Sequence, residues 1–440
     1  MAESRAVSDG GLGSVRGMGM LCVLAVVCGV LIGFVGGAFR WCLREADQWR
    51  GDMLEWAHEL PGPGWLIPVA VTATGAGLAA LIVRWAPQAS GSGIQRVEAV
   101  SRGEAKSSPL RVLPAKFVGG LLSIGSGLVL GREGPTVHMG AAIGAEAGRR
   151  VELGDDDARL LETSIAGAGL AVAFNAPLGG ALFVFEEVTK TFRARTVITT
   201  LLAVAVAVAC SRIVLGDHPD FRVVDVDSPS ITLLPVFVVF GILTGALGVV
   251  YNKLILGSLD LVARFPTVPR EVKAAIIGAI VGALLVVDPL AAGGGDDLAQ
   301  KLIGGGSIAL TAVVGYLVVR LFAGPLSYAS ATPGGLFAPL LAVGALWGVL
   351  FVGVADVFVP GVDSSLKIAM AVVGMAAFFG AVVRAPLTGM LLVIEMTAVT
   401  SVTVPMIAAT VMAVVVAELA GSQPIYDSLR ERMLNSRPHA

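Results

Sequence analysis

The sequence predicts an all-α integral membrane protein with many tilted and partly spanning helices, arranged as two structural repeats. Its composition, its apolar runs and its internal similarity lead to this fold class. Of the 440 residues, 55% are hydrophobic and only 15% are charged, and the mean hydropathy is +0.82. A soluble domain carries about 25% charged residues. The net charge of −2 offers no basic field for a nucleic acid, so we expect no nucleic-acid partner.

Apolar runs of spanning length recur along the chain, because a helix needs about 20 such residues to cross the hydrocarbon core. They cover 17–39, 64–83, 197–210, 230–256, 307–322, 367–383 and 402–417. Runs that are shorter, or cut by glycine and proline, cover 110–130, 134–147, 164–174, 176–186, 274–287, 336–353 and 386–396. The runs are continuous and not alternating, so they predict roughly ten or more helices, several not fully spanning, rather than a β-barrel.

The first run lacks a signal-peptide cleavage pattern and is long enough to form a first transmembrane helix. The four cysteines lie in or beside apolar segments, with a spacing that indicates neither a zinc site nor a disulfide framework. We therefore expect small buried hydrophobic side chains at Cys22, Cys28, Cys42 and Cys210. The sequence predicts no metal site and no cofactor.

Loop charges predict an orientation in the membrane. Segment 41–59 is rich in acids, whereas segments 95–111 and 190–195 are basic, as is a C-terminal tail with Arg430, Arg432 and Arg437. By the positive-inside rule, the basic loops and the C-terminus are cytoplasmic. The tail after Glu418 is short, so we expect no cytosolic regulatory domain, and a bacterial inner membrane as the location.

The two halves of the chain contain similar segments in the same order, which predicts a first repeat over 1–220 and a second over 221–440. The matched pairs are "SGSG" (90–93) with "AGGG" (292–295), "GREGP" (131–135) with "GLFAP" (335–339), and "APLGGALFVFEE" (176–187) with "APLTGMLLVIEM" (385–396). Repeats with broken helices in corresponding positions indicate a transporter site near the bilayer midplane.

Close packing of a duplicated bundle is the alternative explanation, since glycines allow helices to approach each other. Packing accounts for the glycines but does not account for an acid at Glu133, which is costly at membrane depth. The residues alone leave the relative orientation of the repeats open. Only inverted repeats let both halves build a single midplane site.

Three glycine-bearing segments open apolar helical runs: "GSGIQ" (91–95), "GREGP" (131–135) and "GLFAP" (335–339). Unpaired N–H groups at a helix start carry about half a positive charge. In lipid these groups need partners, and a small anion satisfies several at once. For Ser92, a capping box with Gln95 is the alternative to an anion ligand. We expect anion-path helix starts at Gly131, Arg132, Gly134, Pro135 and Gly335.

Arg132 and Glu133 are adjacent, so their side chains point to different sides and a direct ion pair is not the natural geometry. A carboxylate at membrane depth can instead take up a proton, which removes most of the cost of its burial. Glu133 among anion-binding N–H groups is therefore predicted to compete with the anion. When it is protonated it can swing away, so that one residue is both a gate and a proton carrier.

These residues are where the chain resembles a known family, the CLC chloride channels and chloride/proton exchangers, especially the bacterial exchangers. The resemblance extends from the first helix to Tyr426. Its motifs, in order, are "GSGI" (91–94), "LPAKFVGG" (113–120), "GREGPTV" (131–137), "NAPLGGALFVFEE" (175–187), "GGLFAPLLAVG" (334–344), "RAPLTG" (384–389) and "QPIY" (423–426). The resemblance implies the CLC fold, with two inverted-topology repeats.

The resemblance also implies a role for each matching residue. Hydroxyl groups of Ser92 and Tyr426 and the backbone N–H groups of Leu336 and Phe337 bind the central chloride, with Gly93 and Ile94 in the same anion-binding motif. Glu133 matches the external gating glutamate, and Glu187 matches the inner proton-transfer glutamate. Lys116 matches a basic residue with an electrostatic role. A homodimer in membrane lipid, with one chloride and proton pathway per subunit, is implied as well.

Two functions remain open within this fold: a chloride/proton antiporter, and a passive voltage- or pH-gated chloride channel. Glu187 favours the antiporter, although it can also be a charged helix end that meets the cytoplasm. Gln95 departs from the family, in which many members have proline there, and so adds a donor and a flexible amide. An intramembrane enzyme using His138 is not expected, because no H-E-x-x-H or G-x-S-x-G motif is present.

Overall fold

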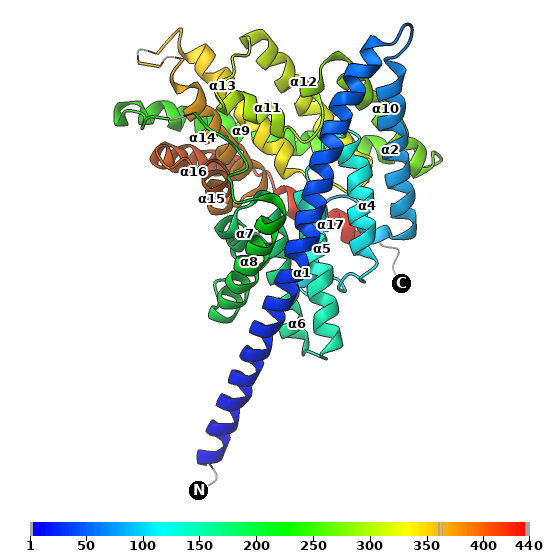
Figure 1. Ribbon diagram of the computed structural model, residues 1–440. Coiled ribbons are helices and arrows are strands. Elements are labelled where there is room, and N and C mark those ends of the chain that lie inside the picture. The colour runs from blue at the N-terminus through cyan, green and yellow to red at the C-terminus, as the bar shows by residue number, and fades with distance from the viewer. Residues whose placement is uncertain (1–2, 225, 360, 363, 436–440) are drawn as a thin grey trace.

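The computed structural model describes residues 3–224, 226–359, 361–362 and 364–435. Within these ranges the chain is helical, and its only β-type pairings are two isolated bridges (Figure 1). The helices of the first half are α1 (Glu3–Glu59), α2 (Leu66–Trp85), α3 (Ile94–Ser101), α4 (Val112–Gly125), α5 (Glu133–Arg150), α6 (Asp155–Phe174), α7 (Pro177–Phe183), the π-helical turn η2 (Val184–Val188) and α8 (Ala194–Leu215).

The second half contains α9 (Leu234–Ala263), α10 (Arg270–Val287), α11 (Asp296–Ile303), α12 (Leu310–Ala329), α13 (Phe337–Ala355), α14 (Leu366–Val383), α15 (Pro386–Thr397), α16 (Thr403–Leu419) and α17 (Ile425–Asn435). Short 3₁₀ turns lie at η1 (Pro87–Ala89), η3 (Ile231–Leu233) and η4 (Pro289–Ala291). Arg437 and His439 lie outside the described residues.

Seven helices of the described chain are long and apolar enough to cross a membrane, which confirms the integral membrane class. Two predictions of helix length are wrong: the run at 336–353 was expected to be short or interrupted, and the run at 402–417 was expected to span the membrane. The first forms α13, which is of spanning length, and the second forms α16, which has 17 residues. Gly344 and Gly348 do not interrupt α13, because each lies against the backbone of α14, where a Cβ would fall within 2.3 Å of a carbonyl oxygen.

The prediction of a loop at 41–59 is wrong, because α1 continues without a break from Glu3 to Glu59. The helix continues through its charged residues beyond the apolar run, and Arg50 forms hydrogen bonds in this part. Arg50 donates to Asp47 at 2.6 Å and to the carbonyl of Gly125 at 3.1 Å. The helix ends only at the "PGPG" segment that follows Leu60.

Segment 95–111 is also not a loop throughout, since its first residues belong to α3 and only the residues after Ser101 leave the helix. The expectation that the cysteines are buried holds for Cys28 alone. Cys22, Cys42 and Cys210 are half-buried, and all four are free thiols.

The helices of the two halves follow the same order. Short α3 and α11 have eight residues each, and each begins after a glycine with positive φ, Gly93 and Gly295. The pairs α5 and α13, α6 and α14, and α7 and α15 follow in the same sequence. We propose on this ground that residues 1–220 and 221–440 are the two repeats, joined by the linker between α8 and α9.

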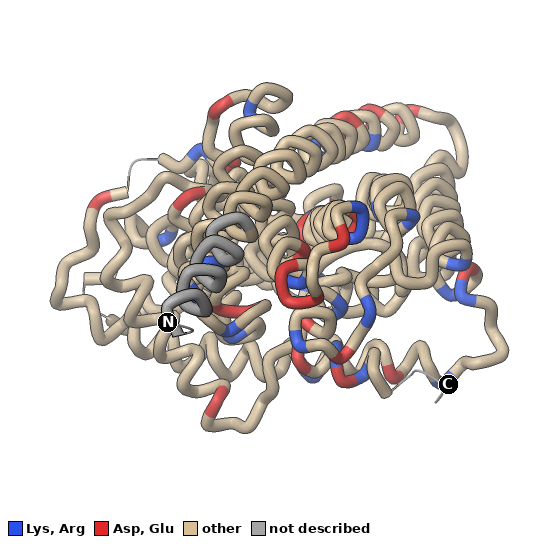
Figure 2. Tube along the Cα trace, turned by 90° about the horizontal axis from the view of Figure 1, so that it is seen from below, with Lys and Arg blue, Asp and Glu red and all other residues tan. Residues whose placement is uncertain are grey.

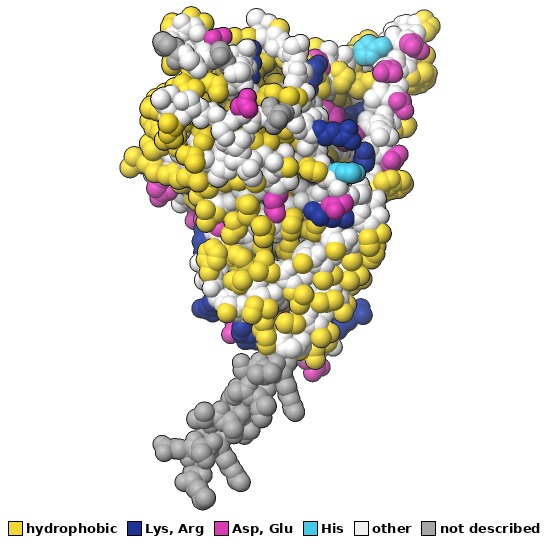
Figure 3. Space-filling view, turned by 60° about the vertical axis from the view of Figure 1, so that its left-hand side comes forward, with side chains coloured by type: hydrophobic (Ala, Val, Ile, Leu, Met, Phe, Trp, Pro, Cys, Tyr) yellow, Lys and Arg dark blue, Asp and Glu magenta, His cyan; other side chains and the backbone are white. Residues whose placement is uncertain are grey.

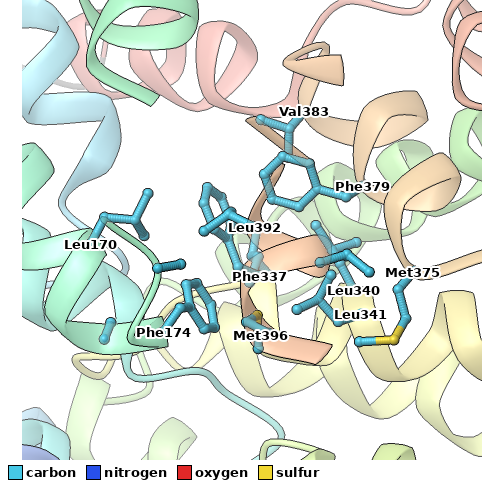
Figure 4. Close-up of a cluster of buried hydrophobic side chains, with 14 of the residues drawn as sticks. Leu170, Phe174, Phe337, Leu340, Leu341, Met375, Phe379, Val383, Leu392 and Met396 are labelled. Atoms are coloured by element: carbon cyan, nitrogen blue, oxygen red, sulfur yellow. The ribbon is translucent and has the colours of Figure 1, made fainter. Parts of the chain in front are cut away.

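The core lies around Phe337, the first residue of α13 (Figure 4). The Phe337 ring meets the ring of Phe379 edge to face, with centroids 4.6 Å apart, and the ring of Phe183 at 6.0 Å. In Figure 4, side chains from α6, α13, α14 and α15 converge on this ring, including Phe174 and Leu392. The start of α13 is therefore fixed by dense apolar packing contributed by both halves of the chain.

Gly140 in α5 tests the close packing of α5 on α6. A Cβ at this position would lie 2.3 Å from the carbonyl oxygen of Ile165, so Gly140→Leu forces the two helices apart. We expect a lower melting temperature in detergent, because overpacking of a core costs about 1–3 kcal/mol. Gly315→Leu is the matched control, since a Cβ on this helical glycine has nothing within 4 Å. Equal melting temperatures for the two variants would contradict the packing argument.

Candidate functional site

Two glycine segments from opposite halves of the chain lie side by side in the interior. Gly131 and Gly335 form an antiparallel bridge, with N···O distances of 2.9 and 2.7 Å. A Cβ on Gly131 or Gly335 would lie 2.0 or 2.1 Å from an oxygen of the Glu133 carboxylate. A side chain at either position would displace the carboxylate from the place that it occupies in this structure.

The Glu133 side chain is fully buried and engages a helix start in the other half of the chain. Its Oε1 accepts a hydrogen bond of 2.6 Å from the backbone N–H of Phe337, whereas its Oε2 has no hydrogen-bond partner. Phe337 opens α13, and Leu336 before it is fully buried. The glutamate thus holds one of the N–H groups that the sequence predicted for an anion.

Two buried hydroxyl groups near this contact, Ser92 Oγ and Tyr426 Oη, have no hydrogen-bond partner among the described residues. Ser92 lies against the turn after Glu133, since a Cβ on Gly134 would be 2.5 Å from Ser92 Oγ. The Tyr426 ring packs on the Phe337 ring, with centroids 5.6 Å apart. The structure therefore brings together the hydroxyls of Ser92 and Tyr426 and the N–H of Phe337.

The capping-box alternative for Ser92 is not formed. Gly93 is the N-cap residue of α3, and α3 has no side-chain cap. Gly93 has a φ of +95°, and Ile94 after it is fully buried. A Cβ on Gly93 would lie 2.3 Å from Nδ1 of His138, so both the backbone conformation and the contact require glycine.

His138 and Lys116 contact the loop of residues 91–93. His138 Nε2 is hydrogen bonded to Ser108 Oγ at 2.8 Å, which agrees with its interpretation as a packed helix residue. Lys116 is fully buried, and its ammonium donates to the carbonyls of Gly91 at 2.6 Å and Ser92 at 2.9 Å. The sequence indicated only an electrostatic role for Lys116. Its contacts fix the orientation of the backbone on either side of the Ser92 side chain.

Arg132 does not pair with Glu133. Its guanidinium donates to Asp220 at 3.0 Å, to Asp296 at 3.3 Å and to the carbonyl of Ala173 at 2.9 Å. Asp220 also accepts from Arg40 at 2.5 Å. Arg132 thereby ties the start of α5 to the linker after α8 and to α11. Pro135, in the first turn of α5, is buried beside it, where the missing N–H of proline costs no helical bond.

Glu187 lies in the π-helical turn η2 and is 2% exposed, so it is not a charged helix end that meets solvent. It lies near Glu98, which is fully buried in α3, the helix that η2 contacts. Sequence reasoning missed Glu98 and counted it as a loop charge. The apolar neighbours Val97, Ala99 and Val100 were the signal that it lies in a buried helix. Two carboxyl groups buried near each other do not readily carry two negative charges, so one of them favours its protonated form.

The neighbouring acid Glu186 has a different, structural role, and Glu395 repeats it. The Glu186 carboxylate accepts from the N–H groups of Leu387 at 3.0 Å and Thr388 at 2.7 Å, at the start of α15. Glu395 accepts in the same way from Leu178 at 3.0 Å and Gly179 at 2.7 Å, at the start of α7. Glu186 and Glu395, which occupy the same position in the two matched segments, thus each cap the helix start of the other segment. Glu187 has no acidic counterpart in the second half.

Broken helices that meet at a buried carboxylate, with unpartnered hydroxyls beside it, define a membrane transport protein with a midplane site. The description "Voltage gated chloride channel" belongs to the family model that matches residues 74–418. This chain belongs to that family, which is the CLC family that the motifs indicated.

Several known proteins are similar to the chain over most of its length. The "H(+)/Cl(-) exchange transporter ClcA" of Vibrio parahaemolyticus is 38% identical over 427 residues, which are 94% of this chain and 90% of that protein. The same-named protein of Salmonella arizonae is 35% identical over 94% of this chain and 89% of its own.

Solved structures have the same fold. A slow cyanobacterial Cl−/H+ antiporter superimposes with a TM-score of 0.89 at 31% identity, covering 95% of this chain and 98% of its own. A CLC-type fluoride/proton antiporter has a TM-score of 0.76 at 22% identity, covering 92% and 96%, and supports the fold alone. The CLC fold expected from the motifs is therefore confirmed.

Lys116 provides a test of how the Ser92 loop is held. Lys116→Met keeps the length of the side chain but leaves the carbonyls of Gly91 and Ser92 without their donor. We expect a lower melting temperature, because each buried polar group left unpaired costs about 1–3 kcal/mol. Lys253→Met, at an exposed lysine of α9, is the control. If Lys116→Met unfolds at the wild-type temperature, these hydrogen bonds do not hold the loop.

Proposed function

We propose that this protein is a secondary active transporter that exchanges chloride for protons through a midplane anion site gated by Glu133. One observation carries the proposal. The Glu133 carboxylate occupies the N–H of Phe337, while the neighbouring hydroxyls of Ser92 and Tyr426 have no partner. A carboxylate and a chloride ion therefore compete for the same donors. The relatives named as H(+)/Cl(-) exchange transporters support the same assignment.

The competition links anion movement to proton movement. Ionised Glu133 accepts from the Phe337 N–H at the positive end of α13, which excludes a second anion from that place. Protonation removes the negative charge, so the side chain no longer matches the helix start and is free to leave. Chloride then takes the N–H groups of Leu336 and Phe337 together with the hydroxyls of Ser92 and Tyr426.

The paired acids favour exchange over a passive channel. Glu187 is buried near the buried carboxyl group of Glu98, whereas a group that merely ends a helix would be hydrated. We assign Glu187 as the inner proton carrier, with Glu98 as the carboxyl group that shares its proton. Protons then reach Glu133 from the side of η2, while chloride passes between Ser92 and Tyr426. A channel needs no such buried pair.

We base the proposed location on the family, and the proposed oligomeric state on the exposed apolar side chains. We place the protein in a bacterial inner membrane with a cytoplasmic C-terminus, and we assign it transport rather than catalysis. Apolar side chains cover much of the face shown in Figure 3. Large exposed ones lie on α7, α8, α15 and α16, among them Leu178, Ile198, Leu387, Ile407 and Val411. This face suits a second copy of the chain, so we propose a homodimer in lipid with one pathway per subunit.

The proposal predicts coupled fluxes in liposomes that contain the purified protein. An outward chloride gradient drives proton uptake against a proton gradient, recorded as external alkalinisation together with chloride efflux. In Glu133→Gln and Glu187→Gln, proton movement is lost and chloride efflux persists, because neither amide can carry a proton. Chloride efflux of the wild-type protein speeds up as the pH falls, since protonated Glu133 leaves its place.

Glu186→Gln separates a proton role from a cap role in the same turn. Its amide oxygen can still accept from the start of α15, so we expect proton coupling to survive this change. Wild-type chloride flux without proton movement would make the protein a channel. The absence of any anion flux from correctly folded protein would contradict the transport assignment.

A further inference from the structure

Asp427 in the first turn of α17 accepts hydrogen bonds from three cations. Its Oδ1 accepts from Arg102 at 2.8 Å and from Arg430 at 3.2 Å, and its Oδ2 accepts from Lys190 at 3.1 Å. Arg430 also donates to Glu104 at 2.5 Å. In Figure 2, acidic and basic segments alternate along the loops near the C-terminus. We call these five residues the Asp427 cluster.

Each segment that meets in the Asp427 cluster carries a group of the transport site. Asp427 directly follows Tyr426. Arg102 caps the C-terminal end of α3, the helix that begins two residues after Ser92 and contains Glu98. Lys190 lies three residues after Glu187. One carboxylate thus ties together the segments that carry the anion-binding hydroxyls and the paired acids.

Helix α17 also forms a wall of the pathway. A cavity of about 280 Å³ lies between α17 and the start of α3, lined by Gly91, Gly93, Gln95, Leu429 and Arg432. Tyr426 is fully buried at the inner end of α17, beside Phe337. A tilt of α17 therefore moves the Tyr426 hydroxyl away from Ser92 and opens this cavity toward the anion site.

The three cations around Asp427 favour its charged form. Burial acts to raise the pKa of Asp427, but the hydrogen bond and charge of Lys190 and the charges of Arg102 and Arg430 outweigh it and lower this pKa below its ordinary value. The side chains are 17% exposed at Asp427, 30% at Arg102 and 47% at Lys190. Pairs this exposed contribute little to stability, so the network is better suited to fixing the direction of α17 than to holding the fold together.

We propose that Asp427 is a positioning residue of the exchange cycle, which holds Tyr426 against the anion site in register with Ser92 and Glu187. The inference rests on the exchange function proposed above. Exchange requires that chloride not pass to the cytoplasm while Glu133 is away from its place. With the first turn of α17 tied to α3 and to the segment after η2, Tyr426 keeps the inner end closed. Without this tie, chloride passes without a proton.

The test is the ratio of protons to chloride ions moved by Asp427→Asn in liposomes, with both fluxes recorded in one sample. We expect this ratio to fall to about half of the wild-type value or less, with chloride flux equal or faster, as for a loosened gate. Asp427→Glu, which restores the charge, recovers most of the ratio. Lys190→Gln and Arg102→Gln lower the ratio in the same direction, and each adds little when combined with Asp427→Asn.

Asp157→Asn is the control, because Asp157 forms a part-exposed ion pair with Arg195 at 3.0 Å and is not a member of the Asp427 cluster. It retains the wild-type ratio. An unchanged ratio in Asp427→Asn overturns the inference, and so does an equal loss of both fluxes, which would indicate a structural role only. If Asp427→Asn does not fold, Lys190→Gln decides by the same criterion, since Lys190 is half exposed.

Different measurements would contradict the role of Asp427 and the proposed exchange function. Wild-type protein that moves chloride without protons contradicts the exchange function before any variant is tested. Wild-type exchange together with a normal ratio in Asp427→Asn contradicts only the role of Asp427.

Discussion

The hydrogen bond from the Phe337 N–H to the Glu133 carboxylate is the contact on which the rest of this structure depends. It joins the start of α13 to the start of α5, across the boundary between the two halves of the chain. A helix start buried in an apolar interior leaves donors without water, and a carboxylate buried there leaves a charge without solvent. Each of these costs is lowered by the other group, and in the proposed cycle chloride replaces the carboxylate.

Bringing these groups together places strict demands on the surrounding backbone. Gly131 and Gly335 leave room for the carboxylate, and Gly134 leaves room for Ser92. Lys116 satisfies the carbonyls that the Ser92 loop turns inward, and the aromatic packing of Phe337 holds the start of α13 in place. The helix starts are thus held by apolar packing, while Glu133, the gate in the proposed cycle, retains an oxygen without a partner among the described residues.

Away from the central aromatic packing, charged groups join segments of the two halves of the chain. Glu186 and Glu395 each cap a helix start in the opposite half, which joins α7 to α15 by two reciprocal contacts. The Asp427 cluster joins the ends of the site-bearing segments at the surface. Fixed reciprocal caps and a part-exposed network differ in strength. The first holds α7 and α15 together, and the second sets the direction of α17 without adding much to the stability of the fold.

Composition and apolar runs by themselves determined the membrane class and most of the helices, since burial in lipid imposes its pattern directly on the sequence. The motifs likewise determined which helix starts and which acid, Glu133, belong to the site. Only the tertiary structure decided that 41–59 continues α1, that Glu98 meets Glu187, and that Glu186 is a cap. These depend on which partners a charged group meets after folding, because a charge with a buried partner and a charge in water look the same in a sequence.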